Sequence, residues 1–253
     1  MYISDMDVIS NTARNKYNLS KDKPIKYLTR SIVAGFYLVV AIILSYTTGA
    51  VLYTNYPEIS RIMVAATFSI ALALIVFLGG ELFTGNNLVM GMGFFAKSCN
   101  FKMVLRVWIL SYLGNLIGAI IISFLFVKSG ASMGLIKDYV ANIVNVKLNL
   151  SATEMFLRGV LCNFMVCLGV LSTIRLKSES GKLIMMFWCV FGFVIAGFEH
   201  SIANMGIFSI AYFVLGGLPV GLMLNNLLWV TLGNIVGGAV LLALPLKLMS
   251  VDE

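Results

Sequence analysis

Charged residues are scarce in this sequence. They make up 11% of its 253 residues, against roughly 25% in a soluble domain, while 60% of the residues are hydrophobic and the mean hydropathy is +0.95. This balance excludes a water-soluble protein. The apolar runs are long enough for helices across a hydrocarbon core of about 30 Å, and they lack the alternating pattern of an outer-membrane barrel. We therefore predict an all-α integral membrane protein.

Histidine and cysteine are also rare. His200 is the one histidine, and the cysteines Cys99, Cys162, Cys167 and Cys189 contain no CxxC pair. A metal site needs several such ligands at suitable spacing, so we expect no metal and no cofactor, and we interpret the four cysteines as packing thiols. An intramembrane enzyme would need a nucleophile–base pair or a metal cluster, and we therefore expect no enzyme.

The first 30 residues lack the pattern of a leader peptide. Residues 1–30 hold six basic residues without a central apolar block, so we expect no cleavable secretory signal.

Six apolar runs follow, of which the second and the fifth are too long for one straight helix. Gly, Glu and Asn interrupt both, a pattern typical of broken helices. The predicted spans lie near 30–52, 61–97, 103–127, 153–174, 183–213 and 225–246.

The spans divide the chain into five segments. We expect a cytoplasmic N-terminal segment at 1–24, which is either a short surface helix or a disordered tail. Spans one to three occupy 25–127 and spans four to six occupy 153–247. An extracellular linker at 128–152 separates them, and a cytoplasmic tail at 248–253 follows.

Basic residues indicate the orientation. With both termini in the cytoplasm, most Lys and Arg fall on the inner side, as the positive-inside rule requires. We expect a multi-pass protein of the inner (cytoplasmic) membrane, and the net charge of +7 reflects this topology rather than a nucleic-acid partner. The few basic residues expected outside are Arg61, Lys128, Lys137, Lys147 and Arg158.

Two matches relate the halves of the chain. The motif LGN occurs at 113–115 and 232–234, an offset of 119 residues, and the spacing E-x4-N occurs at 81–86 and 199–204, an offset of 118. Three spans per half give the halves opposite senses across the membrane. We therefore predict an inverted 3+3 repeat, as in transporters and channels, whose broken second and fifth helices meet near the bilayer midplane and line a solute pathway.

Polar residues in the breaks are the candidates for function. Imidazole can donate a hydrogen bond to an anion or exchange a proton, and ionisable groups inside a membrane mark pathways, so we expect His200 to lie on the solute path rather than serve only packing. Thr84 either donates a hydrogen bond toward the same solute or caps the freed backbone. Glu81 and Glu199 open the two breaks, where a carboxylate can accept backbone N–H groups.

Two residues of the second half complete this set. Lys147 precedes Ser151-Ala152-Thr153-Glu154, a capping box that opens span four. It either draws anions into an outer vestibule or is an ordinary solvated lysine. Asn163 lies in mid-span and is a candidate partner that orients the imidazole.

These motifs resemble the formate/nitrite transporter family over residues 25–247. The stretches that carry the resemblance are GFEHSIANM at 197–205, GGELFTGN at 79–86 and NFMVC at 163–167. The resemblance implies an aquaporin-like fold of six spans, a homopentamer with one pore per protomer, and small monovalent anions of weak acids as substrates.

The resemblance also implies roles for individual residues. His200 corresponds to the central pore histidine, Thr84 to the threonine on the loop that breaks span two, Lys147 to the vestibule lysine, and Asn163 and Glu199 to the network that supports the histidine. Apolar residues would narrow the pore on either side, where a hydrophobic ring excludes a hydrated ion. The corresponding positions are Phe68, Leu72, Leu82, Phe83, Val166 and Phe193.

The expected function is a channel for hydrosulfide, formate or nitrite that is pH-sensitive through His200. The segment GIFSI at 206–210 favours the hydrosulfide branch of the family. One alternative is an aquaporin-like channel for neutral solutes, although neither break contains an Asn-Pro-Ala triplet and all four prolines lie elsewhere. A second alternative is a proton-coupled formate or nitrite transporter.

Overall fold

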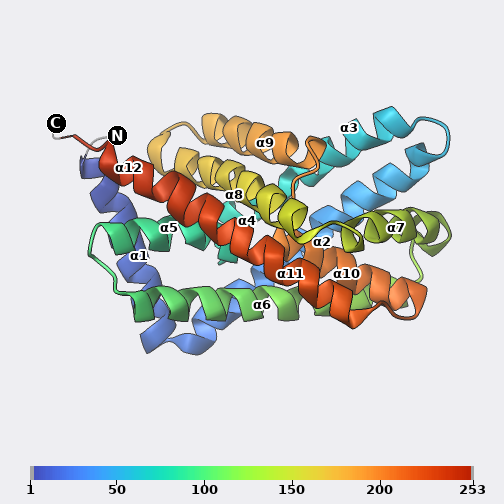
Figure 1. Ribbon diagram of the computed structural model, residues 1–253, viewed down its shortest axis with the longest axis horizontal. Helices are drawn as coiled ribbons and strands as arrows, with labels where there is room; N and C mark the ends of the chain where they lie inside the picture. Colours follow the sequence, from blue (N-terminus) through green and yellow to red (C-terminus); the bar gives the residue numbers. More distant parts are fainter. Residues whose placement is uncertain (1–2, 252–253) are drawn as a thin grey trace.

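The computed structural model describes residues 3–251, and every element in this range is a helix (Figure 1). Both termini lie at one end of the molecule and α7 lies at the other, which defines an α1 end and an α7 end. The elements are α1 (Ile3–Asp22), α2 (Pro24–Tyr53), α3 (Pro57–Phe68), α4 (Ile70–Phe77), α5 (Phe83–Phe95), α6 (Phe101–Lys128), α7 (Met133–Leu148), α8 (Ala152–Arg175), α9 (Glu179–Ile195), α10 (Ser201–Leu215), α11 (Val220–Ile235), η1 (Val236–Ala243) and α12 (Leu244–Leu248).

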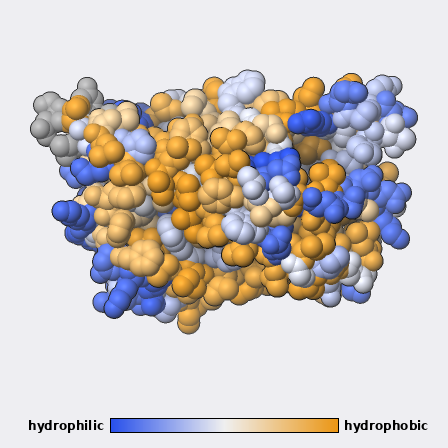
Figure 2. Space-filling view, in the orientation of Figure 1, coloured by the Kyte–Doolittle hydropathy of each residue, from blue (hydrophilic) through white to orange (hydrophobic). Residues whose placement is uncertain are grey.

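Five helical segments of the described chain are long and apolar enough to cross a membrane. Six spans were expected. The fifth expected span is divided between α9 with 17 residues and α10 with 15, and neither half alone meets the length of a full crossing. Figure 2 shows a broad hydrophobic surface between hydrophilic ends, as a multi-pass membrane protein requires. The five segments are Pro24–Tyr53, Pro57–Phe77, Phe101–Lys128, Ala152–Arg175 and Val220–Leu248.

The two predicted helix breaks are confirmed. One lies at 78–82, between α4 and α5, and the other at 196–200, between α9 and α10. Gly79 and Gly197 occupy corresponding positions with φ of +74° and +76°, a left-handed conformation that glycine adopts without steric cost. The sequence did not predict the additional interruption at Ser69 or the π-helical turn η1.

The asparagines of the two LGN motifs hold these breaks. Asn115 accepts the Phe83 N–H at 3.0 Å and donates to the Glu81 carbonyl at 2.9 Å. Asn234 accepts the Ser201 N–H at 2.9 Å and donates to the Glu199 carbonyl at 3.0 Å. A broken helix leaves such backbone groups without partners, and one amide in each half satisfies a donor and an acceptor. The two halves therefore use the same hydrogen bonds at the offsets found in the sequence.

The segments outside the spans are also helical. The N-terminal segment forms the 20-residue helix α1 rather than a disordered tail, and the side chains of Met6, Ile9 and Ala13 on this helix are buried. The linker at 128–152 contains α7. The capping box before α8 is present, with the Ser151 hydroxyl accepting the Glu154 N–H at 3.3 Å.

Candidate functional site

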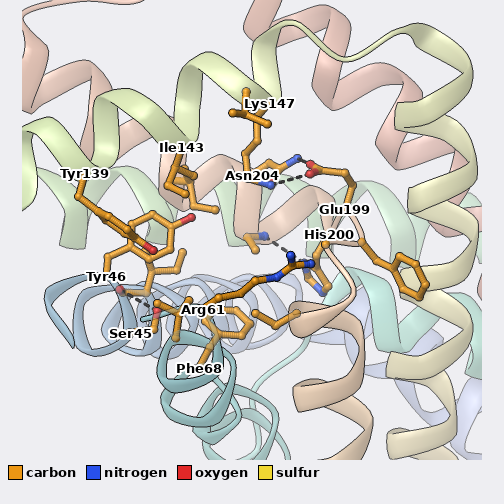
Figure 3. A pocket seen from close by; sticks show the side chains of 18 of the residues that line it. Ser45, Tyr46, Arg61, Phe68, Tyr139, Ile143, Lys147, Glu199, His200 and Asn204 are labelled. Carbon is orange, nitrogen blue, oxygen red and sulfur yellow. Dashed lines mark hydrogen bonds and ion pairs between the residues drawn. The ribbon is translucent and has the colours of Figure 1, made fainter. Parts of the chain in front are cut away.

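A cavity of about 450 Å³ lies at the α7 end, between α2, α3, α7, α9 and α10. We call it the vestibule. Figure 3 shows Tyr46, Tyr139 and Ile143 on its wall, with His200 near the break before α10. Apolar side chains dominate this lining, so the few charged groups in it determine which solutes it favours.

A second cavity of only about 10 Å³ lies beyond His200. Phe68, Phe193 and His200 line both cavities, so the vestibule narrows to these three side chains. The space beyond them is apolar. Five of the six constriction positions expected from the sequence line it: Phe68, Leu72, Leu82, Val166 and Phe193.

The sixth position, Phe83, was expected at the constriction and lies elsewhere. Its ring packs edge-on against Tyr112 at 5.0 Å and Trp108 at 6.3 Å, both on α6. The reason is local, because Leu82 is the extended residue before α5 and Phe83 is the first residue of the helix, so their side chains diverge. Leu82 alone reaches the path.

His200 is fixed at both ring nitrogens. Its Nδ1 accepts the Ala203 N–H at 3.0 Å, which makes the ring the N-cap of α10, and its Nε2 lies 2.9 Å from Thr84 Oγ1. The ring also stacks on Phe193, with centroids 5.9 Å apart. An imidazole nitrogen that accepts a hydrogen bond carries no proton, so the neutral ring holds its proton on Nε2 and donates it to Thr84.

This geometry limits what the histidine can do. A second proton on Nδ1 would face the Ala203 N–H and break the cap, which costs a helix about 1 kcal/mol. Since Thr84 Oγ1 receives the Nε2 proton, its own hydroxyl hydrogen is not used in this bond. His200 lines both cavities and Thr84 is buried behind it, so a hydroxyl polarised by a neutral imidazole lies one hydrogen bond away from the side chain that faces the path.

The pair joins the two halves of the chain. At the offset of 118 residues, Leu82 corresponds to His200 and Ile202 corresponds to Thr84. Each break thus supplies one polar and one apolar side chain, and the polar ones meet across the molecule.

The sequence suggested that Glu199 could accept backbone N–H groups freed by the break, but its carboxylate binds side chains instead. Its carboxylate accepts Lys147 Nζ at 2.7 Å and Asn204 Nδ2 at 2.6 Å. Asn226, which the sequence analysis missed, accepts a second Asn204 N–H at 2.8 Å and donates to the Lys147 carbonyl at 3.0 Å. These bonds form a closed ring between α7, α10 and α11 that fixes Lys147 in the vestibule wall.

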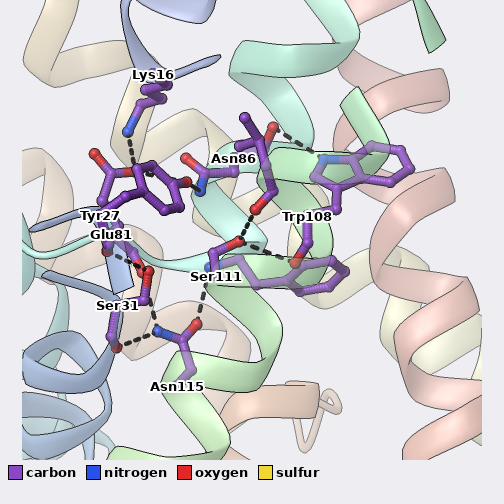
Figure 4. Close-up of polar contacts among 10 residues, drawn as sticks. Lys16, Tyr27, Ser31, Glu81, Asn86, Trp108, Ser111 and Asn115 are labelled. Carbon is purple, nitrogen blue, oxygen red and sulfur yellow. Dashed lines mark hydrogen bonds and ion pairs between the residues drawn. The ribbon is translucent and has the colours of Figure 1, made fainter. Parts of the chain in front are cut away.

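A similar arrangement lies toward the α1 end (Figure 4). Glu81 accepts Lys16 Nζ at 2.6 Å, and Tyr27 donates to the same carboxylate at 3.3 Å. Asn86 in turn donates to Tyr27 Oη at 3.0 Å. Lys16 belongs to α1, so a lysine from outside the spans neutralises the glutamate of each break. Lys16 was not predicted as a partner of Glu81, because helical periodicity alone does not show where α1 docks.

Asn163 was expected to orient the imidazole, and its amide instead donates to the Asn234 carbonyl at 2.6 Å. The support for His200 is therefore indirect. Asn163 holds Asn234, whose side chain binds the backbone on both sides of the histidine. Among the described residues, no group of three His, Cys, Asp or Glu could hold a metal ion.

Comparisons with known proteins agree with this architecture. The model of the family described as formate/nitrite transporter matches residues 4–248. The nitrite transporter NirC of Escherichia coli (strain K12) is 34% identical over 249 residues, which cover 94% of this chain and 90% of that protein. A probable formate transporter of Methanothermobacter thermautotrophicus is 34% identical over 236 residues and covers 86% of both chains.

Two solved structures are similar over nearly their whole length. A structure described as an FNT family ion channel has a TM-score of 0.89 and 30% identity, and the match covers 97% of this chain and 98% of the other. A structure described as a pentameric formate channel with formate bound has a TM-score of 0.79 and 29% identity, with 91% and 98% covered.

Proposed function

Because this chain belongs to the formate/nitrite transporter family, we propose that it conducts formate, nitrite or hydrosulfide across the cytoplasmic membrane. The observation that carries the proposal is the His200–Thr84 pair, bonded at 2.9 Å where the vestibule meets the apolar constriction. The substrates of this channel are small monovalent anions of weak acids, the class to which the named substrates of its relatives belong.

The constriction determines the chemical form that crosses. Transfer of a bare ion into an apolar passage costs many kcal/mol, whereas the neutral acid loses only hydrogen bonds to water. Phe68, Phe193 and Leu82 therefore favour an anion that takes up a proton before it passes. Thr84 donates a hydrogen bond to the solute at this point, and His200 polarises that hydroxyl.

Conduction is then pH-sensitive, with His200 as a neutral partner. A falling pH raises the fraction of substrate that is protonated, while the Ala203 cap opposes a second proton on the ring. In a proton-coupled transporter of the same fold, by contrast, His200 would gain and lose a proton in each cycle, and the cap bond would have to break each time.

The orientation and assembly follow the same family. The α7 end faces outward, both termini lie in the cytoplasm, and the hydrophobic flanks contact lipid and neighbouring protomers of a homopentamer. The exposed apolar side chains between the hydrophilic ends support this arrangement (Figure 2).

The test is anion flux into proteoliposomes, with hydrosulfide, formate and nitrite compared with glycerol and water. We expect rapid weak-acid flux in the wild type, a loss of about tenfold or more in Thr84→Val, and near-normal flux in the matched control Thr84→Ser, which keeps the hydroxyl. His200→Asn should also reduce the flux. Glycerol or water flux alone, unchanged in these variants, would favour the aquaporin-like alternative and refute the proposal.

A further inference from the structure

Lys147 contributes little net charge to the vestibule. Its ammonium lies 2.7 Å from Glu199, and the two side chains are only 15% and 4% exposed. A cation and an anion at this distance cancel at the range over which a solute is attracted. Lys147 was a candidate for drawing anions into the vestibule, and the carboxylate beside it removes most of that field.

Arg61 is the other cation of the vestibule wall. It reaches in from α3 (Figure 3) and is exposed, and no carboxylate of the described residues forms an ion pair with it. Glu58 lies one turn earlier on the same helix and is outside ion-pair distance. Among the described residues, Arg61 is therefore the vestibule cation that has no paired carboxylate.

The guanidinium is held in place by neutral atoms. Arg61 Nε and Nη2 donate to the Ile195 carbonyl at 3.1 Å and 2.7 Å, at the end of α9. A guanidinium has five N–H groups in one plane, so both N–H groups of Nη1 and the second one of Nη2 remain available. The carbonyl at a helix C-terminus also favours a cation at this place.

Among the described residues that line the vestibule, no other group pairs with this charge. Glu199, the one carboxylate in its lining, is already paired with Lys147. Tyr139 lies on α7, outside the spans, and burial raises its pKa to about 12, so its phenol stays neutral.

We propose that Arg61 is the anion-binding residue of the vestibule and that it favours planar anions with two acceptor oxygens over an anion with a single acceptor atom. Formate and nitrite can accept two parallel N–H groups from one guanidinium, whereas hydrosulfide offers one sulfur atom. This inference rests on the proposed function, and it gives the outer mouth a preference within that substrate class.

The two halves differ at this position. At the offset of 118 residues that relates the breaks, Glu179 at the start of α9 corresponds to Arg61. The hydrogen bonds that build the breaks are the same in both halves, and this charge is reversed. Arg61 therefore belongs to the vestibule rather than to the shared framework.

The experiment measures the half-saturating concentrations of formate and hydrosulfide in proteoliposomes. Arg61→Gln removes the charge and keeps an amide donor for Ile195. We expect it to raise the value for formate about threefold to tenfold, and by a factor at least twice as large as for hydrosulfide. Arg61→Lys should keep the value for hydrosulfide and raise that for formate. Lys137 is an exposed cation of α7 outside the vestibule lining, so Lys137→Gln is the control and should change neither concentration.

A second readout does not require conduction. Formate at saturating concentration should slow the modification of Arg61 by phenylglyoxal, followed by mass spectrometry, and leave Arg158, which pairs with Glu154, unaffected. Wild-type flux with an unchanged formate value in Arg61→Gln would overturn the Arg61 site alone. If the wild type conducts none of the anions, the proposed function fails, and absence of formate protection would then overturn the site independently.

Discussion

Lys147 and Glu199 form a buried ion pair, so the loss of either charge should affect stability in a way that depends on the other. Lys147→Met would leave the Glu199 carboxylate, 4% exposed, with Asn204 at 2.6 Å as its remaining side-chain partner. Removal of one partner of a buried ion pair costs about 3–5 kcal/mol. Glu199→Gln should cost only about 1–2 kcal/mol, because Lys147 is more exposed and can turn into the vestibule.

The double variant separates the pair from its surroundings. Lys147→Met combined with Glu199→Gln leaves no buried charge, so its cost should be close to that of Glu199→Gln alone. The coupling free energy is then about 3 kcal/mol or more, to be measured by unfolding with SDS in mixed micelles. The exposed pair of Arg158 and Glu154, at 3.1 Å, serves as the control and should give less than about 1 kcal/mol.

Additive costs of the two single variants would contradict this coupling. If the free energies of unfolding of the two single variants add within about 0.5 kcal/mol, the two charges do not depend on each other. Glu199 would then be stabilised chiefly by Asn204, and Lys147 would be free to act on solutes.

Three further predictions concern the breaks, the constriction and α1. Asn234→Leu should destabilise the fold by about 2–4 kcal/mol in the same SDS titration, since the backbone groups beside His200 lose their partner, and a cost below 1 kcal/mol would contradict its role. Phe193→Ala should allow glycerol to leak through proteoliposomes, because its ring lines both cavities, and an intact glycerol barrier would place the constriction elsewhere. Burial raises the pKa of the Cys99 thiol, so maleimide should label it slowly at pH 7 and faster as the pH rises. Ile9→Asp should undock α1 and speed the labelling of Cys99 about tenfold, and an unchanged rate would mean that α1 does not shield the thiol.

Sequence reasoning located the breaks because their signals are local. A glycine, a glutamate and an asparagine inside an apolar run are visible without tertiary structure, and the offset of 118 residues links the runs. His200 and Thr84 were singled out for the same reason, since a polar group in a membrane span needs an explanation. Their direct bond across 116 positions was not predicted, because the sequence placed the two side chains on opposite sides of a solute.

The missed features depend on packing between distant elements. Lys16 meets Glu81 across 65 positions and Arg61 meets the Ile195 carbonyl across 134, and no spacing rule connects such pairs. The misassigned residues have the same cause. Asn163 is polar and in mid-span, but its amide faces α11 rather than the imidazole, and the rotation of a helix about its axis is set by its neighbours.

The two halves show which residues build the fold and which distinguish the pathway. Positions that correspond at the offsets of 118 and 119 and keep their chemistry, such as Asn115 with Asn234, satisfy backbone groups that every broken helix exposes. Other positions lose the correspondence, and one of them lies at the constriction, where Leu82 stands for His200. A repeat related by a twofold axis would give both mouths the same properties. Only substitutions that break this equivalence can make the two mouths differ. Removal of the charged Arg61 guanidinium should therefore change the vestibule while the breaks stay intact.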